Sequence, residues 1–273
     1  MGSSWGPSSP GVRLEAPDRG HTVVLRLSRP DVLNALTVDM LVDLAAGMRW
    51  FGTAGRAAGI VLAGEGRAFS SGDDLLATED MNRETFRTLI EAFQDVTRAI
   101  YQTEVPVVAA LNGIAVGGAA EMACACDLRV GCPSSEFLFP ENALGLTISN
   151  GSTLILPSLA GRKAIGLILM GERITAERAH ALGLLDVMVK DCGQVDIEAR
   201  RVAAALGEEG RATRLHVAML RLPMEQVEEA LKGEVDAALD AWDRGWPQQG
   251  IERFIQERQA RRAEKARGPG DAP

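Results

Sequence analysis

Aromatic side chains are few in this chain of 273 residues, which has 7 Phe, 4 Trp and 1 Tyr. Hydrophobic residues still make up 46% of the chain and charged residues 24%, so a disordered or fibrous protein is excluded. The core is therefore expected to consist mainly of Ala, Val, Leu and Ile. The single tyrosine, Tyr101, lies in a predicted helix well before the site motifs, so a phenol is a poor candidate for a catalytic acid.

Long apolar runs and an excess of basic charge are also missing. No stretch approaches the roughly 18 apolar residues of a membrane helix, and residues 1–10 lack the basic start and apolar core of a signal peptide. The chain has 29 Lys and Arg against 37 Asp and Glu, a net charge of -8 that argues against a nucleic-acid-binding surface. We therefore expect a soluble, cytoplasmic protein that binds neither nucleic acid nor membrane.

The 4 cysteines and 3 histidines do not form the pattern of a metal site. Paired Cys-x-x-Cys blocks are absent, and the histidines lie far from the cysteines in the sequence. This spacing supports neither a zinc site nor a disulfide framework. We expect no bound metal, and we expect buried free thiols in a reducing cytosol at Cys124, Cys126, Cys132 and Cys192.

Short apolar strands alternate with amphipathic helices in the first part of the chain. Strands are predicted over 22–27, 59–63 and 106–111, and helices over 38–51, with Thr37 as its N-cap, and 82–101. Continuous apolar strands of this kind indicate an α/β fold whose sheets are covered on their faces.

The sequence changes to charged amphipathic helices from about residue 194. In the clearest of them an apolar stripe runs from Met224 to Trp242. We predict a flexible N-terminus over 1–11, an α/β core with the active site over 12–195, a helical region over 196–267 and a flexible tail over 268–273. A helical region this long either packs back on the core or joins subunits.

Two glycine-containing turns, 67–75 and 112–121, each follow a buried strand and lead into a possible helix start. Backbone N–H groups at such a turn have no partner within the helix, so they can bind an anion. Two such turns that converge would form an oxyanion hole. A Rossmann fingerprint is excluded because Phe69 stands where its last glycine is needed, and a P-loop because no Gly-Lys-Ser/Thr occurs.

Two glutamates stand close to these turns or among apolar neighbours. Glu121 falls three residues after Gly118, on the first turn of the predicted helix, and Glu141 lies in a mostly apolar stretch. Each has an ordinary explanation, as an acid favoured by the helix dipole or as an acid beside a turn. An acid among apolar residues also has a raised pKa, which suits a general acid or base at neutral pH.

These motifs, in this order and spacing, resemble the crotonase superfamily, the enoyl-CoA hydratase/isomerase family. The matching segments cover nearly the whole chain: 29–36, 68–74, 106–113, 117–121, 126–129, 140–145 and 175–186. The resemblance implies a spiral of repeated β-β-α units, followed by a C-terminal helical trimerisation region whose trimers often pair as hexamers. It also implies an acyl-CoA thioester as substrate, with no cofactor beyond that coenzyme A.

The same resemblance implies individual site residues. The oxyanion hole would consist of the backbone N–H groups of Asp73 and Gly118, which stabilise a thioester enolate. Phe254 would touch coenzyme A bound to a neighbouring subunit. The other acyl-CoA contacts are expected at Val32, Ala35, Leu36, Ala68, Ser71, Asp74, Leu75, Leu76, Gly117, Ser149 and Asn150, and also at Asp73 and Gly118.

Glu121 and Glu141 match the two acids of true hydratases, which favours syn addition of water to a 2-enoyl-CoA to give a 3-hydroxyacyl-CoA. Glu141 would protonate the α-carbon and Glu121 would activate the water. Three positions depart from the family pattern: Ser149 replaces a glycine, Asn150 adds a polar side chain, and Asp73 replaces a small residue. Double-bond isomerisation, hydrolysis or decarboxylation therefore stay open, as does an inactive acyl-CoA-binding subunit.

Overall fold

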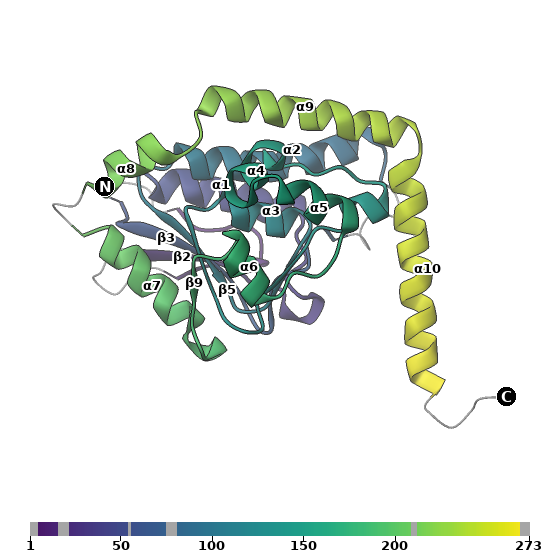
Figure 1. Cartoon of the computed structure of the whole chain (residues 1–273), viewed down its shortest axis with the longest axis horizontal. Coiled ribbons are helices and arrows are strands. Elements are labelled where there is room, and N and C mark those ends of the chain that lie inside the picture. The colour runs from purple at the N-terminus through teal and green to yellow at the C-terminus, as the bar shows by residue number, and fades with distance from the viewer. Residues whose placement is uncertain (1–4, 16–21, 54–55, 75–80, 209–211, 268–273) are drawn as a thin grey trace.

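The computed structural model describes residues 5–15, 22–53, 56–74, 81–208 and 212–267 (Figure 1). Two sheets form its centre, and all neighbouring strands in them are parallel except β1 and β2. The larger sheet has the order β1 (Val12–Glu15), β2 (Thr22–Leu27), β3 (Gly59–Gly64), β5 (Val107–Leu111), β7 (Leu128–Gly131), β9 (Val187–Met188). The smaller sheet has the order β4 (Ala68–Ser70), β6 (Ile114–Val116), β8 (Glu136–Leu138).

The chain alternates between the two sheets, as the expected β-β-α spiral requires. Strand β3 is followed by β4 and then by helix α2 (Arg83–Gln102), and β5 by β6 and helix α3 (Gly118–Ala125). Strand β7 is followed by β8 and the 3-10 helix η3 (Glu141–Leu144). Because β4, β6 and β8 are parallel neighbours, the segments that follow them meet at one edge of the smaller sheet. The predicted α/β architecture is confirmed.

Most predicted elements appear with nearly the expected bounds. Helix α1 (Val38–Phe51) begins at Thr37, whose hydroxyl accepts a hydrogen bond from the Met40 N–H. The long helix α2 begins one residue later than expected, after Asn82, whose side chain caps it. The remaining helices are α4 (Ser152–Ala160), α5 (Lys163–Met170), α6 (Ala176–Leu182), α7 (Val195–Leu206), α8 (Thr213–Leu220), α9 (Met224–Asp243) and α10 (Trp246–Arg267), with two further 3-10 helices η1 (Pro30–Val32) and η4 (Cys192–Gln194).

Alternate residues of the central strands serve two apolar clusters. Ile60 and Leu62 of β3 belong to the larger one, which also contains residues of α1, α2 and α3. Val61 and Ala63 belong to the smaller one, with Val195, Ala199 and Ala203 of α7. Side chains of a strand point alternately to its two faces, so the larger sheet is covered on both sides.

The expectation that all cysteines are free thiols is wrong for one pair. Cys132, just after β7, forms a disulfide with Cys192 at the start of η4, and their Cα atoms are 5.1 Å apart. Sixty residues separate them in sequence, so spacing alone gave no sign of the pair, which the pairing of β7 with β9 brings together. Cys124 and Cys126 are buried free thiols, as expected.

The C-terminal helices pack on different parts of the core: α7 packs on the larger sheet, α9 on α2, and α10 on η3 and α9. Helix α9 runs along α2, and α10 turns away from its end and projects beside the body (Figure 1). Phe86 and Ile90 of α2 pack there with Val235 and Leu239 of α9. Among the described residues no helix is long and apolar enough to cross a membrane.

Candidate active site

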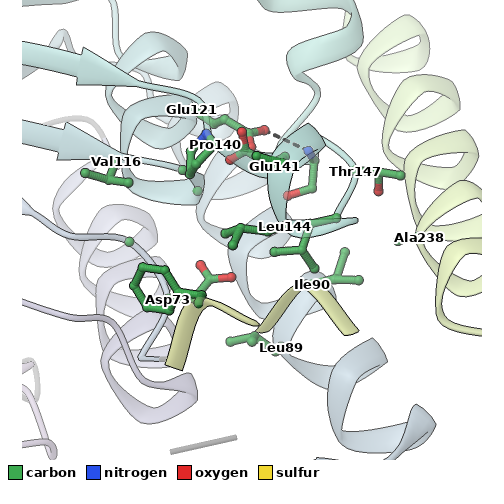
Figure 2. A pocket seen from close by; sticks show the side chains of 18 of the residues that line it. Asp73, Leu89, Ile90, Val116, Glu121, Pro140, Glu141, Leu144, Thr147 and Ala238 are labelled. Atoms are coloured by element: carbon green, nitrogen blue, oxygen red, sulfur yellow. Dashed lines mark hydrogen bonds between the residues drawn. The ribbon is translucent and has the colours of Figure 1, made fainter. Parts of the chain in front are cut away.

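A cavity of about 430 Å³ opens where the segments after β4, β6 and β8 meet (Figure 2). These segments contribute Gly72 and Asp73, Gly117 and Gly118, and Glu141. Helix α2 and the C-terminal helices α9 and α10 close the other sides. The two glycine turns and both glutamates selected from the sequence therefore line one space.

Glycine is required where the two turns touch. Gly72 has φ +79°, and a Cβ atom there would lie 2.6 Å from the carbonyl oxygen of Val116. Gly117 has φ +56°, and a Cβ atom on Gly118 would lie 2.8 Å from the ring of Phe93. A side chain at Gly72 would push the two turns apart, and one at Gly118 would push the start of α3 away from α2.

Two backbone N–H groups of these turns are not used by the local secondary structure. Leu36 forms a parallel bridge opposite Asp73: its N–H donates to Gly72 O at 2.9 Å, and its carbonyl accepts from the Asp74 N–H at 3.1 Å. The N–H of Asp73 itself therefore points away from Leu36. Gly118 is the first residue of α3, so its N–H has no acceptor within that helix.

The carboxyl groups of Glu121 and Glu141 face each other across one end of the cavity (Figure 2). Glu121 is 1% exposed and accepts a hydrogen bond from the Ser149 N–H at 2.8 Å. Glu141 is 5% exposed, and its Oε2 is buried with no hydrogen-bond partner in the described part of the chain. Glu121 thus has a backbone donor from the loop before α4, whereas one oxygen of the Glu141 carboxyl is buried without a partner among the described residues.

Burial disfavours the ionised form of both glutamates. It raises the pKa of Glu141 to about 8, and the nearby carboxyl of Asp73 acts in the same direction. Burial, and then the charge of Glu141, also raise the pKa of Glu121 well above its usual value. Two acids this close cannot both ionise easily, so their protonation is coupled.

Asp73 adds a third carboxyl group to the same space. Its side chain points into the cavity (Figure 2), and its Oδ1 is buried without a hydrogen-bond partner among the described residues. Burial raises the pKa of Asp73 to about 6. The neighbouring Asp74 is instead paired with Arg29 at 2.9 Å and does not line the cavity.

The other predicted contacts divide into two groups. Ser71, Ser149 and Phe254 line the cavity together with the residues above, and Phe254 does so within its own chain, so its contact with a neighbouring subunit stays a prediction. Leu75 and Leu76 lie outside the described residues. The residues that do not line the cavity are Val32, Ala35, Leu36, Ala68, Asp74 and Asn150.

Asn150 has a structural position that the sequence did not indicate. It is fully buried with φ +61°, and its Nδ2 donates to the carbonyl of Gly118 at 3.0 Å. This bond holds the loop before α4 against the start of α3. Asn150 therefore positions the backbone of Ser149, whose N–H reaches Glu121.

Sequence reasoning missed the apolar side of the cavity. Its walls include one face of α2, which the sequence predicted only as a helix, together with residues of β6, β8 and the segment after β8, and of α9 and α10. The helical spacing of the apolar residues on α2 showed that one face is buried. It could not show whether this face packs in the core or lines a cavity. The missed lining residues are Phe86, Leu89, Ile90, Phe93, Val116, Leu138, Pro140, Ala143, Leu144, Leu146, Thr147, Ala238, Gly250, Arg253 and Glu257.

Comparison with known proteins agrees with this architecture. The sequence profile described as enoyl-CoA hydratase/isomerase matches residues 19–264. A protein of Rhodobacter capsulatus named "probable enoyl-CoA hydratase" is 35% identical over 250 residues, covering 86% of this chain and 91% of its own. A crotonyl-CoA hydratase of Syntrophomonas wolfei is 29% identical over 241 residues, covering 87% and 92%.

Solved structures give the same answer. The enoyl-CoA hydratase of Bacillus anthracis superposes with a TM-score of 0.72 at 26% identity, over 90% of this chain and 96% of that one. An enoyl-CoA hydratase of Mycobacterium avium has a TM-score of 0.80 at 24% identity, over 90% and 96%, and so shows the shared fold alone. The chain belongs to the enoyl-CoA hydratase/isomerase family, the crotonase superfamily.

Proposed function

We propose that the protein adds water to the double bond of a 2-enoyl-CoA and forms a 3-hydroxyacyl-CoA. The observation that supports this most is the pair of buried glutamates, Glu121 and Glu141, in one cavity with two glycine turns whose Asp73 and Gly118 N–H groups are used neither by the Leu36 bridge nor within α3. The relatives named as hydratases support the same reaction.

The N–H groups of Asp73 and Gly118 bind the thioester oxygen, which becomes negative as the enolate forms. One such donor contributes about 10²–10³ in rate in other oxyanion holes. Donors fixed by the backbone need no rearrangement during the reaction. The positive φ values at Gly72 and Gly117 maintain this geometry.

The environments of the two glutamates assign their roles. The Ser149 N–H stabilises the ionised form of Glu121, so Glu121 accepts a proton from water while the oxygen bonds to the β-carbon. The Oε2 atom of Glu141 has no hydrogen-bond partner in the described chain, and the raised pKa keeps this carboxyl protonated at neutral pH. Glu141 therefore delivers its proton to the α-carbon. Overall, one O–H bond of water and the π bond of the alkene break, and one C–O and one C–H bond form; transfer of the proton from Glu121 to Glu141 then restores the pair. Each acid/base group contributes about 10²–10⁴ in rate.

The charged residues of the cavity favour some of the alternative reactions over others. Asp73, Glu121 and Glu141 line it, and Arg253 is the one basic residue among the described lining residues. A decarboxylase substrate carries a carboxylate, which an ionised acid in this cavity would repel. Double-bond isomerisation needs only one carboxyl group and is the second candidate. An inactive acyl-CoA-binding subunit would bind without turnover.

A panel of enoyl-CoA thioesters in heavy water, followed by mass spectrometry, tests the proposal. Hydration adds one water and places deuterium on the α-carbon, isomerisation exchanges hydrogen without the water, and an inactive subunit does neither. Glu121→Gln and Glu141→Gln should each reduce hydration by about 10²–10⁴, since hydration uses both acids. Glu177→Gln, an exposed acid at the start of α6, is the control and should match the wild type. Absence of hydration with every thioester would refute the proposal.

We also propose a homotrimer or a dimer of trimers, located in the cytoplasm and needing no cofactor beyond the substrate's coenzyme A. Exposed apolar side chains on α8, Leu215, Met219 and Leu220, support a subunit contact, since apolar clusters on a surface often mark interfaces. Light scattering should give three or six times 29.1 kDa. Disulfides are uncommon in the cytosol, so the redox state of Cys132 in cells tests the location.

A further inference from the structure

The side of the cavity away from the glutamates is apolar. Leu89, Ile90 and Phe93 of α2 line it, and Leu146 and Ala238 face them from the loop before α4 and from α9. Figure 2 places Leu89, Ile90 and Ala238 away from the two glutamates. An acyl chain whose thioester lies between Asp73 and Gly118 can extend only along this apolar arm if it is to avoid the acids.

Two stacked aromatic rings stand beside this arm. Phe86 of α2 lines the cavity, is 4% exposed, and stacks on Trp242 of α9 with 4.7 Å between ring centroids and 28° between planes. Trp242 in turn lines a second cavity of about 420 Å³, which is bounded by apolar residues, Met81, Ile251 and Ile255, and by polar ones, Gln248, Glu252, Gln256 and Gln259. Phe86 does not line the second cavity, and Trp242 does not line the first. The stacked pair therefore separates the two spaces.

We propose that the Phe86–Trp242 pair is the end wall of the acyl-binding arm and restricts the enzyme to enoyl-CoA substrates with short, apolar acyl chains. This inference rests on the proposed function, because it takes the first cavity as the acyl site. Phe86 belongs to a buried cluster with Ile90, Val235, Ala238 and Leu239, and the half-buried Trp242 packs against this cluster. A close-packed cluster of this kind does not move aside for extra methylene groups.

The wall has a measurable signature in a series of chain lengths. Each methylene that enters an apolar arm increases binding about fourfold, because it is removed from water. The increase stops when the chain reaches the stacked rings. A plot of the logarithm of affinity against the number of acyl carbons should therefore rise and then level off, and the chain length at which it levels off is the break.

Removal of one ring should move this break. In Trp242→Ala the two cavities join once Phe86 can turn aside, so the fourfold increments should continue to longer chains than in the wild type. Phe86→Leu removes the ring on the side of the first cavity and should also move the break to longer chains. This variant tests the proposal if Trp242→Ala folds poorly. Trp50→Ala is the matched control, because Trp50 stacks with Arg56 and lines neither cavity.

The experiment measures Kd by calorimetry for saturated acyl-CoAs of 4 to about 16 carbons, and kcat/KM for the matching enoyl-CoAs. A break in the wild type and in Trp50→Ala that moves to longer chains in either wall variant supports the inference. An unbroken rise in the wild type, or a break at the same length in all proteins, overturns it. The calorimetry needs no turnover, so it tests the wall separately from the reaction. If the protein has no hydratase activity but the break still moves in a wall variant, the proposed function is refuted and the inference about the wall stands.

Discussion

Glu234 is a buried acid on α9 that holds the loop beside the active site. It is 2% exposed and accepts hydrogen bonds from the Gly151 N–H, the Thr153 N–H and the Thr153 hydroxyl, at 2.8, 2.8 and 2.7 Å. Gly151 is the N-cap of α4 and has no side chain to cap it, so Glu234 replaces the missing cap from another helix. We predict that Glu234→Ala destabilises the protein and slows catalysis.

The size of the effect follows from the groups left behind. Two backbone N–H groups lose their acceptor, and a buried donor without a partner costs about 1–3 kcal/mol, so the free energy of unfolding should fall by about 2–6 kcal/mol. Glu234→Gln keeps one acceptor oxygen and should lose less. The catalytic effect arises because the released loop carries Ser149, whose N–H donates to Glu121.

Urea unfolding and steady-state kinetics check both parts. Asp240→Asn is the control, because Asp240 lies on the same helix in an exposed pair with Arg244 and should change stability by less than about 0.5 kcal/mol. If Glu234→Ala unfolds at the same urea concentration as this control, Glu234 does not hold the loop. If the variant is destabilised but its kcat is unchanged, the link from Glu234 to Glu121 is wrong.

Four further results are expected. An ionised Asp73 repels the enolate, so activity should decline as pH rises through about 6 and Asp73→Asn should keep activity to higher pH; identical pH profiles would contradict this. The folded protein keeps the proton of Glu141 up to about pH 8 whereas the unfolded chain loses it near 4.5, so the free energy of unfolding should fall with pH in that window and less steeply in Glu141→Gln, as urea titrations at several pH values can show. Thr147→Val replaces a buried hydroxyl that has no partner in the described chain and should stabilise the protein by about 1 kcal/mol; a loss of stability in urea would count against it. Alkylation of the denatured, unreduced protein should modify two of the four cysteines. The Cys132–Cys192 bond closes a loop of 60 residues, so its reduction should lower the free energy of unfolding in urea by about 4 kcal/mol.

Local signals predicted the parts of the fold that depend on neighbours in sequence. Thr37 before an apolar periodicity gave the start of α1, and continuous apolar runs gave β2, β3 and β5. The short strands β4, β6 and β8 were not predicted from their residues, because three residues carry too little periodicity. Only the resemblance to a family supplied the second sheet.

Site residues with a local sequence signal were also predicted, and those placed only by packing were not. Gly72 and Gly117 were found because a turn after a strand has few possible sequences, and Glu141 because an acid in an apolar stretch is unusual. Glu234 gave no signal, and Trp242 was recognised only as the end of an apolar stripe, since each looks like an ordinary residue of an amphipathic helix. Their partners are more than 80 residues away in sequence, and only the packing of α9 against α2 and α4 brings them together.

The C-terminal helices therefore take part in the site as well as in any assembly. Ala238 lines the apolar arm, Trp242 supports its end, and Glu234 caps the helix that follows the Ser149 loop. Phe254 of α10 lines the cavity from a helix that otherwise projects from the body (Figure 1). A subunit contact that shifts α9 relative to α2 would change the length of the acyl arm and the hydrogen bond to Glu121 together. Substrate length and catalytic rate are for this reason expected to respond jointly to association, even though no catalytic carboxyl group lies on these helices.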